Sequence, residues 1–398
     1  MEKIVAMIIM LLFLFSFISS ENAIHVANTN NVLYVGGTGP NNYTKIQDAI
    51  NDAKDGYIIY VYPGYYNESI VINKSISLIG IGEEKPVING KGNEYTVLIE
   101  ADNCTVKQFV IKHGEIGIEI NGSHTLLENN VIEFSGIGIE IYASNNKIKN
   151  NTVRKCVGIG IYVESSNNSI INNTVVNNKA TGIFIFGHNA RFNTISYNNV
   201  TRNFHGMEID FTKNCTISFN HVYKNKQYGI SIDTCENMSI LNNSIHDHTY
   251  GGLQLMDCSY SIVEGNEIYE NSAGIMVQSS YTWGEHFNLI KRNDVYSNAD
   301  YGIYVERSLY NVFTQNNLIN NGRNAWFWYH VIIGNPSLPI RPCHNRWFNN
   351  YWDDWKSTLP KPVVGLLDVD VDLFDRYICI WSGSWLNFDW HPALEPWK

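Results

Sequence analysis

Short alternations of apolar and polar residues recur along most of the chain. Each begins with glycine, and the residues one and three places after it are nearly always Ile, Val or Leu. Alternation over four residues predicts a β-strand with one buried face. The glycines follow one another at intervals of 21 to 28 residues: Gly117, Gly138, Gly160, Gly182, Gly206, Gly229, Gly252, Gly274 and Gly302.

A second, weaker strand follows in each repeat and carries the pattern apolar-x-x-Asn-x-apolar. A period near 22 residues with several short strands predicts a parallel β-helix, in which turns stack at ~4.8 Å. Leucine-rich repeats have a similar period, but they require leucine where this chain has Ile or Val. Asparagine suits the bends of such a coil, and equivalent asparagines would form a ladder. The repeated asparagines are Asn130, Asn151, Asn173, Asn198, Asn220, Asn243, Asn266, Asn293 and Asn316.

One helix is predicted before the repeats, over residues 43–56. Thr44 and Gln47 have the spacing of a capping box, and Ile46, Ala49, Ile50 and Ala53 form an apolar stripe. A helix at this place would cover the open edge of the first turn.

Four segments make up the predicted organisation. Residues 4–18 are apolar and uncharged and precede two serines, which predicts a signal peptide over residues 1–20, or alternatively a retained anchor. Residues 21–56 would form an N-terminal cap with the helix, and 57–322 the coil. Because all ten tryptophans lie between Trp283 and Trp397, residues 323–398 are predicted to be an aromatic-rich C-terminal cap.

Three stretches carry a family resemblance. The segment IQDAINDAKDGYIIYVYPGYYNESIVINKSISLIG resembles the start of pectin-lyase-like proteins. The GIxI and NxV repeats resemble the NosD-type family, named for a periplasmic accessory that loads copper into nitrous-oxide reductase. NNYWDDW and NFDWHPALEP resemble the C-terminal ends of archaeal surface proteins in that group.

The resemblance covers residues 32–398 and implies an all-β fold, a single-stranded right-handed parallel β-helix (solenoid). This fold serves lyases, polygalacturonases, epimerases and adhesins. The motifs Asp-Pro-His-Glu, Asn-Thr-Asp, Gly-His-Gly and Arg-Ile-Lys of its enzymes are absent from the sequence. The resemblance therefore transfers no catalytic residue. A role as a NosD-like accessory in metal insertion rests on the family alone.

Charge narrows the choice of partner. The formal net charge is -10, with 28 Lys and Arg against 38 Asp and Glu. An acidic chain disfavours nucleic acid and anionic membranes, which recruit basic patches. A polysaccharide or glycan, or a component of the cell envelope, fits better. Twelve N-x-S/T sequons are consistent with a secreted or cell-surface glycoprotein.

Residues two and four places after each glycine are predicted to point outward on one sheet. These positions hold acids and aromatics and no Lys or Arg. Aromatic rings stack on sugar faces and carboxylates accept hydrogen bonds from hydroxyls, so the face predicts carbohydrate binding. With neighbouring loops included, the predicted binding residues are Tyr142, Tyr162, Phe184, Phe186, His205, Tyr228, Gln254, Trp283 and Tyr304.

Carboxylates are densest at Glu208, Asp210 and Asp233. Asp210 and Asp233 should lie one turn apart at ~5 Å, a separation that glycosidases use. These three are the candidate catalytic residues of a polysaccharide hydrolase, which the absence of a basic residue favours over a lyase. The alternatives are a solvated polar face and a Ca²⁺ site. No other cofactor is predicted.

The remaining histidines and cysteines that could bind a metal or react have mainly structural interpretations. His248 occupies a position where other repeats have asparagine, which predicts a place in a ladder, whereas His246 should point outward with no assigned role. Cys235 and Cys258 lie at equivalent places in adjacent turns, a spacing that permits a disulfide. The leading hypothesis is an exported surface β-helix that binds carbohydrate or serves a structural or adhesive role.

Overall fold

The computed structural model describes residues 31–280, 284–333, 344–372 and 377–398. The chain divides into two units, Met1–Val32 and Leu33–Lys398, and the account below concerns the second. The predicted signal peptide lies outside the described residues. Among the described residues, no helix combines the length and apolar character that a membrane crossing requires.

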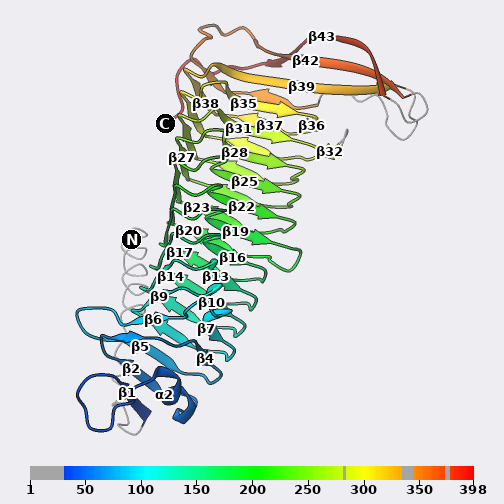
Figure 1. The fold of residues 1–398 in the computed structure, drawn as a ribbon. Helices are drawn as coiled ribbons and strands as arrows, with labels where there is room; N and C mark the ends of the chain where they lie inside the picture. The colour runs from blue at the N-terminus through cyan, green and yellow to red at the C-terminus, as the bar shows by residue number, and fades with distance from the viewer. Residues whose placement is uncertain (1–30, 281–283, 334–343, 373–376) are drawn as a thin grey trace, which may run out of the picture. The chain divides into compact units, whose positions relative to one another are not determined.

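The unit from Leu33 to Lys398 is a coil of short strands that pair in parallel from one turn to the next (Figure 1). We call its three strand stacks stack 1, stack 2 and stack 3. Stack 3 alone holds 13 strands, so the coil has about 13 turns. The predicted all-β parallel β-helix is confirmed.

Stack 1 consists of β4 (Ile70–Ile72), β7 (Tyr95–Ile99), β10 (Ile116–Ile120), β13 (Ile137–Ile141), β16 (Ile161–Val163), β19 (Ile183–Phe186), β22 (Met207–Asp210), β25 (Ile230–Asp233), β28 (Gly251–Met256), β31 (Ala273–Gln278), β35 (Tyr301–Glu306), β39 (Arg323–Ile333) and β42 (Lys361–Asp372). Stack 2 consists of β1 (Val32–Val35), β2 (Ile58–Val61), β5 (Ser77–Gly80), β8 (Thr105–Lys107), β11 (Leu126–Glu128), β14 (Lys147–Lys149), β17 (Ser169–Ile171), β20 (Thr194–Ser196), β23 (Thr216–Ser218), β26 (Ser239–Leu241), β29 (Ile262–Glu264), β33 (Leu289–Lys291), β37 (Val312–Thr314), β40 (Arg346–Phe348) and β43 (Tyr377–Asp389).

Stack 3 consists of β3 (Tyr65–Tyr66), β6 (Val87–Asn89), β9 (Val110–Lys112), β12 (Val131–Glu133), β15 (Thr152–Arg154), β18 (Thr174–Val176), β21 (Asn199–Thr201), β24 (His221–Tyr223), β27 (Ser244–His246), β30 (Glu267–Tyr269), β34 (Asp294–Tyr296), β38 (Asn317–Ile319) and β41 (Tyr351–Trp352). A separate pair is formed by β32 (Gly284–Glu285) and β36 (Ser308–Leu309). Strand β43 also pairs antiparallel with β42, so stacks 1 and 2 meet at the C-terminal end.

The repeated glycine allows successive turns to approach closely. A Cβ atom on Gly160 would lie 2.5 Å from the carbonyl oxygen of Gly182 and 2.7 Å from Val175 Cγ1. The next two inward residues, Ile161 and Val163, are fully buried. The sequence therefore alternates as it does because glycine fits the crowded bend and the branched residues fill the interior.

Asparagine forms the predicted ladder inside the coil. The Oδ1 atom of Asn151 accepts hydrogen bonds from the backbone N–H (3.0 Å) and the Nδ2 (3.1 Å) of Asn130. Asn151 in turn donates to Oδ1 of Asn173 in the next turn. The pattern continues to Asn350, whose backbone N–H and Nδ2 both donate to Asp389 at 3.0 Å. Each carboxamide thus satisfies main-chain groups that would otherwise be buried without partners.

His248 belongs to a second internal ladder, as predicted. Its Nδ1 accepts the backbone N–H of Asn225 at 3.2 Å, and its own N–H donates to Oδ1 of Asn271 at 3.1 Å. Burial lowers the pKa of this imidazole to about 4, so it is neutral at pH 7. A structural role is therefore sufficient to explain the residue.

The N-terminal helix differs from the prediction in its cap. Helix α2 spans Ile46–Asp52, with Lys45 at the N-cap and no capping hydrogen bond from that residue's side chain. The Glu68 carboxylate instead accepts the backbone N–H groups of Ile46 and Gln47, at 2.9 and 3.1 Å. The capping-box prediction was wrong because a carboxylate from the adjoining turn takes that place. A negative charge also suits the positive end of the helix.

Cys235 and Cys258 do not form the disulfide that their spacing would permit. Both are buried free thiols, and each donates to a main-chain carbonyl, of Ile209 (3.3 Å) and Ile232 (3.2 Å) respectively. They occupy equivalent places in adjacent turns, but their Sγ atoms point at carbonyls one turn back rather than forming a bond.

Candidate functional site

The outer face of stack 1 carries the predicted strip, and strand register fixes its order. Glu140, Tyr162, Phe184 and Glu208 are successive partners in β13, β16, β19 and β22. A parallel row runs from Phe186 to Asp210 and on to Asp233. Both rows therefore lead from aromatic residues into the carboxylates in neighbouring turns.

The aromatic part of the strip is continuous, and we define the aromatic strip as Tyr142, Tyr162, Phe184, Phe186 and Phe211. Neighbouring ring centroids along it are 5.7 to 6.4 Å apart. Tyr142 is 46% exposed, and Phe211 is exposed as well. Such a row presents ring edges and faces over several turns, which suits an extended ligand better than a compact one.

The carboxylate cluster lies directly after the aromatic strip. Asp210 and Asp233 are register partners in β22 and β25. Burial, followed by the charges of Glu208 and Asp233, raises the pKa of the Asp210 carboxyl to about 7. At neutral pH, Asp210 therefore exists in both forms and can donate or accept a proton.

Glu208 is held from two sides. Thr181 Oγ1 donates to Oε2 of Glu208, and His205 Nε2 lies 3.6 Å from Oε1. Burial lowers the pKa of His205 although Glu208 opposes this shift, so the imidazole at this contact is largely neutral at pH 7. The His205 ring also stacks on Tyr228, at a centroid distance of 5.9 Å. The structure thus places two of the predicted binding residues together, with His205 beside Glu208 and Tyr228 against the His205 ring.

Other predicted binding residues lie elsewhere. Gln254 is only 5% exposed, and its carboxamide accepts from Ser231 (3.0 Å) and donates to Gln278 (2.7 Å). Register places Tyr304 four turns beyond Glu208, about 19 Å away at ~4.8 Å per turn. Trp283 lies outside the described residues. Gln254 is therefore engaged in the packing of the sheet, and Tyr304 is separate from the cluster.

Metal ligation finds little geometric support at the cluster. The structure, within the residues it describes, has no group of three or more His, Cys, Asp or Glu side chains placed to hold a metal ion. Asp368, in β42, accepts a hydrogen bond from Trp328 Nε1 at 2.7 Å. The Ca²⁺ alternative stays a prediction.

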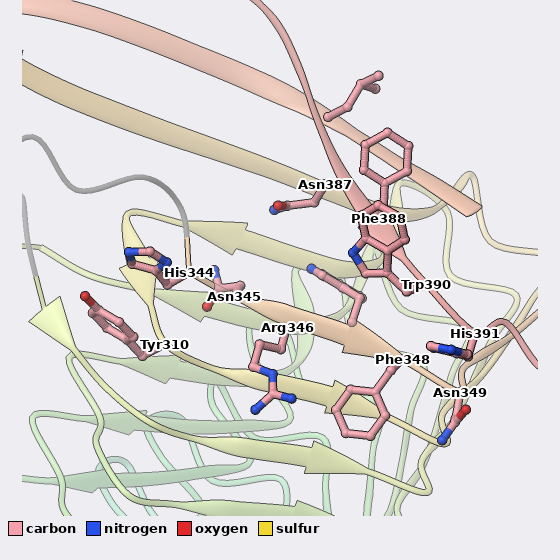
Figure 2. A pocket seen from close by; sticks show the side chains of 12 residues that line it. Tyr310, His344, Asn345, Arg346, Phe348, Asn349, Asn387, Phe388, Trp390 and His391 are labelled. Atoms are coloured by element: carbon pink, nitrogen blue, oxygen red, sulfur yellow. The ribbon is translucent and has the colours of Figure 1, made fainter. Parts of the chain in front are cut away.

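A hollow at the C-terminal cap was missed by the sequence reasoning. Its volume is about 1000 Å³, and it lies between β40 and the end of β43 (Figure 2). Phe348, Phe388 and Trp390 contribute rings to its lining, and Arg346 contributes a guanidinium. Its lining residues include no Asp or Glu. The high tryptophan content of this segment was a signal for it, but which rings converge depends on the return of β43.

Comparison with known proteins supports the fold. The model of the right handed beta helix region matches residues 87–220 and 191–332, more than half of the 398-residue chain. A segment of 79 residues is 43% identical to a cell surface glycoprotein of Methanothermus fervidus. That match covers 19% of this chain and 13% of the glycoprotein, so it spans a small part of that relative's length.

Solved structures show the same architecture at low identity. The A-module of the Azotobacter vinelandii mannuronan C-5 epimerase AlgE4 aligns with a TM-score of 0.63 at 16% identity, covering 70% of this chain and 91% of that one. The Dettilon tailspike protein aligns at 0.63 and 17% identity, over 74% and 69% of the two chains. The catalytic domain of a GH87 α-1,3-glucanase aligns at 0.57 and 16%, over 81% and 70%. These identities demonstrate a shared fold only. The family match over more than half of the chain shows that the chain belongs to the right-handed β-helix family.

Proposed function

We propose that this chain is a surface-exposed or secreted protein that binds a saccharide chain along the outer face of stack 1. The observation that carries the proposal is the continuous aromatic strip leading into Glu208, Asp210 and Asp233. The 43% identical segment of a cell surface glycoprotein supports the location. Structural neighbours named for mannuronan and α-1,3-glucan support a polysaccharide as the partner.

The dimensions of the strip suit an oligosaccharide. From Tyr142 to Phe211 the strip spans three turn-to-turn steps of ~4.8 Å, or about 14 Å. Rings can stack on the apolar faces of sugar units, while the carboxylates accept hydrogen bonds from hydroxyl groups. The strip therefore favours neutral or amino sugars over strongly acidic ones, because acidic sugars would meet the charge of the cluster.

A panel of neutral, amino and acidic polysaccharides, scored by glycan array and calorimetry, tests this proposal. Tyr162→Ala combined with Phe184→Ala should weaken binding about tenfold, which corresponds to about 1.4 kcal/mol. Tyr197→Ala is the matched control, because this ring is 57% exposed but lies on a different edge of the coil, stacked on Phe219. Equal affinity of the double variant and the wild type would refute the strip as the binding surface.

A polysaccharide hydrolase is the second candidate function. The raised pKa of Asp210, at about 7, is the specific observation that favours it, since a general acid must hold a proton near working pH. Release of reducing ends should fall at least a hundredfold in Asp210→Asn and in Asp233→Asn, with glycan binding retained. If the wild type releases no reducing ends from any polysaccharide that it binds, the hydrolase is excluded and binding alone remains.

The hollow at the C-terminal cap is a competing location for the same ligand. Trp390 is 62% exposed and lies in the wall of that hollow. Trp390→Ala in the same panel separates the two locations, since loss of binding in that variant alone would move the site from stack 1 to the cap.

A further inference from the structure

Two histidines face each other on the outside of stack 3, whereas the proposed glycan surface lies on stack 1. His221 begins β24 and His246 ends β27 in the next turn. Their Nε2 atoms are 2.8 Å apart. His221 is exposed to solvent, so an ion could reach the pair without any opening of the coil.

Stacked rings hold both imidazoles in place. His221 stacks on Tyr223 at a centroid distance of 4.4 Å, and His246 stacks on Tyr269 at 4.5 Å. Tyr223 also stacks on His246, at 5.4 Å and an interplanar angle of 13°. His246 is thus held between Tyr223 and Tyr269, whereas the stacking partner of His221 is Tyr223, so His246 is the more preorganised of the two rings.

The hydrogen bonds of His246 determine which nitrogen is available. Its Nδ1 lies 2.8 Å from Oδ2 of Asp247. A carboxylate can only accept there, so the contact favours the tautomer with its proton on Nδ1, and that tautomer has a lone pair on Nε2. A carboxylate behind the distal nitrogen is the usual arrangement that orients a histidine toward a metal ion.

His221 can supply a second lone pair. In the structure its Nε2 donates to Nε2 of His246, because only one proton fits between the two atoms. Among the described residues no hydrogen bond engages its Nδ1, so the proton can move there and leave Nε2 free.

We propose that the Nε2 atoms of His221 and His246 form a two-imidazole site for a divalent transition metal ion, with Asp247 as the positioning residue. Metal–nitrogen bonds are about 2.0–2.1 Å long, so two nitrogens at 90° lie about 2.9 Å apart and at a tetrahedral angle about 3.4 Å apart. The observed 2.8 Å is closer to the spacing of adjacent positions on a tetragonal ion, Cu²⁺ or Ni²⁺, than to that of tetrahedral Zn²⁺. The His221 ring would turn away from its direct contact with His246 so that both Nε2 lone pairs reach the ion. The remaining positions face solvent and would hold water.

The test uses the tag-free full chain after treatment with a chelator. Calorimetric titration with Cu²⁺, Ni²⁺ and Zn²⁺ should show one equivalent bound, with Cu²⁺ tightest. His221→Asn and His246→Asn should each weaken Cu²⁺ binding at least tenfold, and Asp247→Asn about tenfold. His188→Asn is the matched control, because His188 is also exposed but lies near Phe211 on another face; its affinity should equal that of the wild type.

Electron paramagnetic resonance of the Cu²⁺ complex provides a readout that needs no variant. Two equivalent imidazole nitrogens should appear in the spectrum of the wild-type protein. Fewer than two nitrogens, or Cu²⁺ affinity unchanged in both histidine variants, would overturn the site. Zn²⁺ binding tighter than Cu²⁺ would overturn the tetragonal assignment. Glycan binding is measured separately, so failure here leaves the proposed function untouched.

Discussion

Replacement of Asn220 by alanine tests whether the asparagine ladder stabilises the coil. The Asn220 carboxamide accepts the backbone N–H and Nδ2 of Asn198, at 2.9 and 3.0 Å. It donates to the carbonyl of Ile195 (2.8 Å) and to Oδ1 of Asn243 (3.0 Å). Asn220 is 1% exposed, so water cannot replace these bonds.

The expected loss follows from the partners that remain. Asn198 Nδ2 still donates to Ile170, and Asn243 Oδ1 still accepts the backbone N–H of residue 220. The Asn198 N–H and the Ile195 carbonyl lose the Asn220 carboxamide as a hydrogen-bond partner. Each buried polar group that loses its partner lowers the free energy of unfolding by about 1–3 kcal/mol. Asn220→Ala should therefore lower the free energy of unfolding by about 2–6 kcal/mol.

Urea unfolding followed by circular dichroism measures the total loss in the free energy of unfolding. Hydrogen exchange at the Asn198 amide shows whether that loss arises next to the substituted residue. Because a solenoid can unfold turn by turn, exchange is the sharper readout. Asn121→Ala is the control, since the exposed side chain of Asn121 donates to the nearby Glu119 carboxylate, and its removal should change stability by less than about 0.5 kcal/mol. A loss in Asn220→Ala no larger than in this control would refute the reasoning.

Three further changes have expected outcomes. The pKa of Asp210 is raised to about 7, so the folded state binds more protons than the unfolded state between about pH 4 and 7. Stability therefore falls as pH rises through that window. Asp210→Asn should flatten this dependence in melting temperatures measured against pH. The pKa of His248 is lowered to about 4, so the unfolded state binds more protons than the folded state between about pH 6.5 and 4. Stability therefore falls as pH falls through that window. His248→Asn should remove this acid sensitivity and keep the ladder, as acid unfolding curves would show. Gly160→Ala should destabilise by about 1–3 kcal/mol in urea unfolding, because its Cβ would lie 2.5 Å from a carbonyl oxygen, whereas an unchanged midpoint would mean that the turns can separate there.

The coil was predictable because its constraints repeat. Each turn must place branched residues inside, glycine at a crowded bend and asparagine at the ladder, so the pattern appears in nine repeats. A further ladder went unrecognised because other residues replace asparagine in several consecutive turns. It includes Asn146 and Asn168, which bond through the backbone N–H of Asn146 at 2.9 Å, but Cys215 and Met238 interrupt it. A repeated position is visible in a sequence only when its residue type is also repeated.

Features set by contacts between turns could not be read from one turn. Glu68 caps helix α2 from 22 residues away, a distance in sequence that equals one circuit of the coil. Gln254 points outward by its position in β28, as predicted, yet it is buried because Ser231 and Gln278 in the adjacent turns bond to it. The pairing of His221 with His246 is likewise a diagonal contact between turns. Outward direction follows from alternation, whereas exposure and partners depend on the neighbouring turns.

The main asparagine ladder ends at Asp389, and the contacts of this residue explain why it is not an asparagine. Every asparagine within the ladder must accept from the turn before and donate to the turn after. Asp389 stands where the next asparagine would be, and its Oδ2 accepts from the backbone N–H and Nδ2 of Asn350 and from Trp352 Nε1, each at 3.0 Å. The final member needs acceptors only, because no further ladder carboxamide follows it, and a carboxylate provides acceptors without an unsatisfied donor. The change from asparagine to aspartate therefore marks the end of the ladder, and the same segment supplies Trp390 to the hollow beside it.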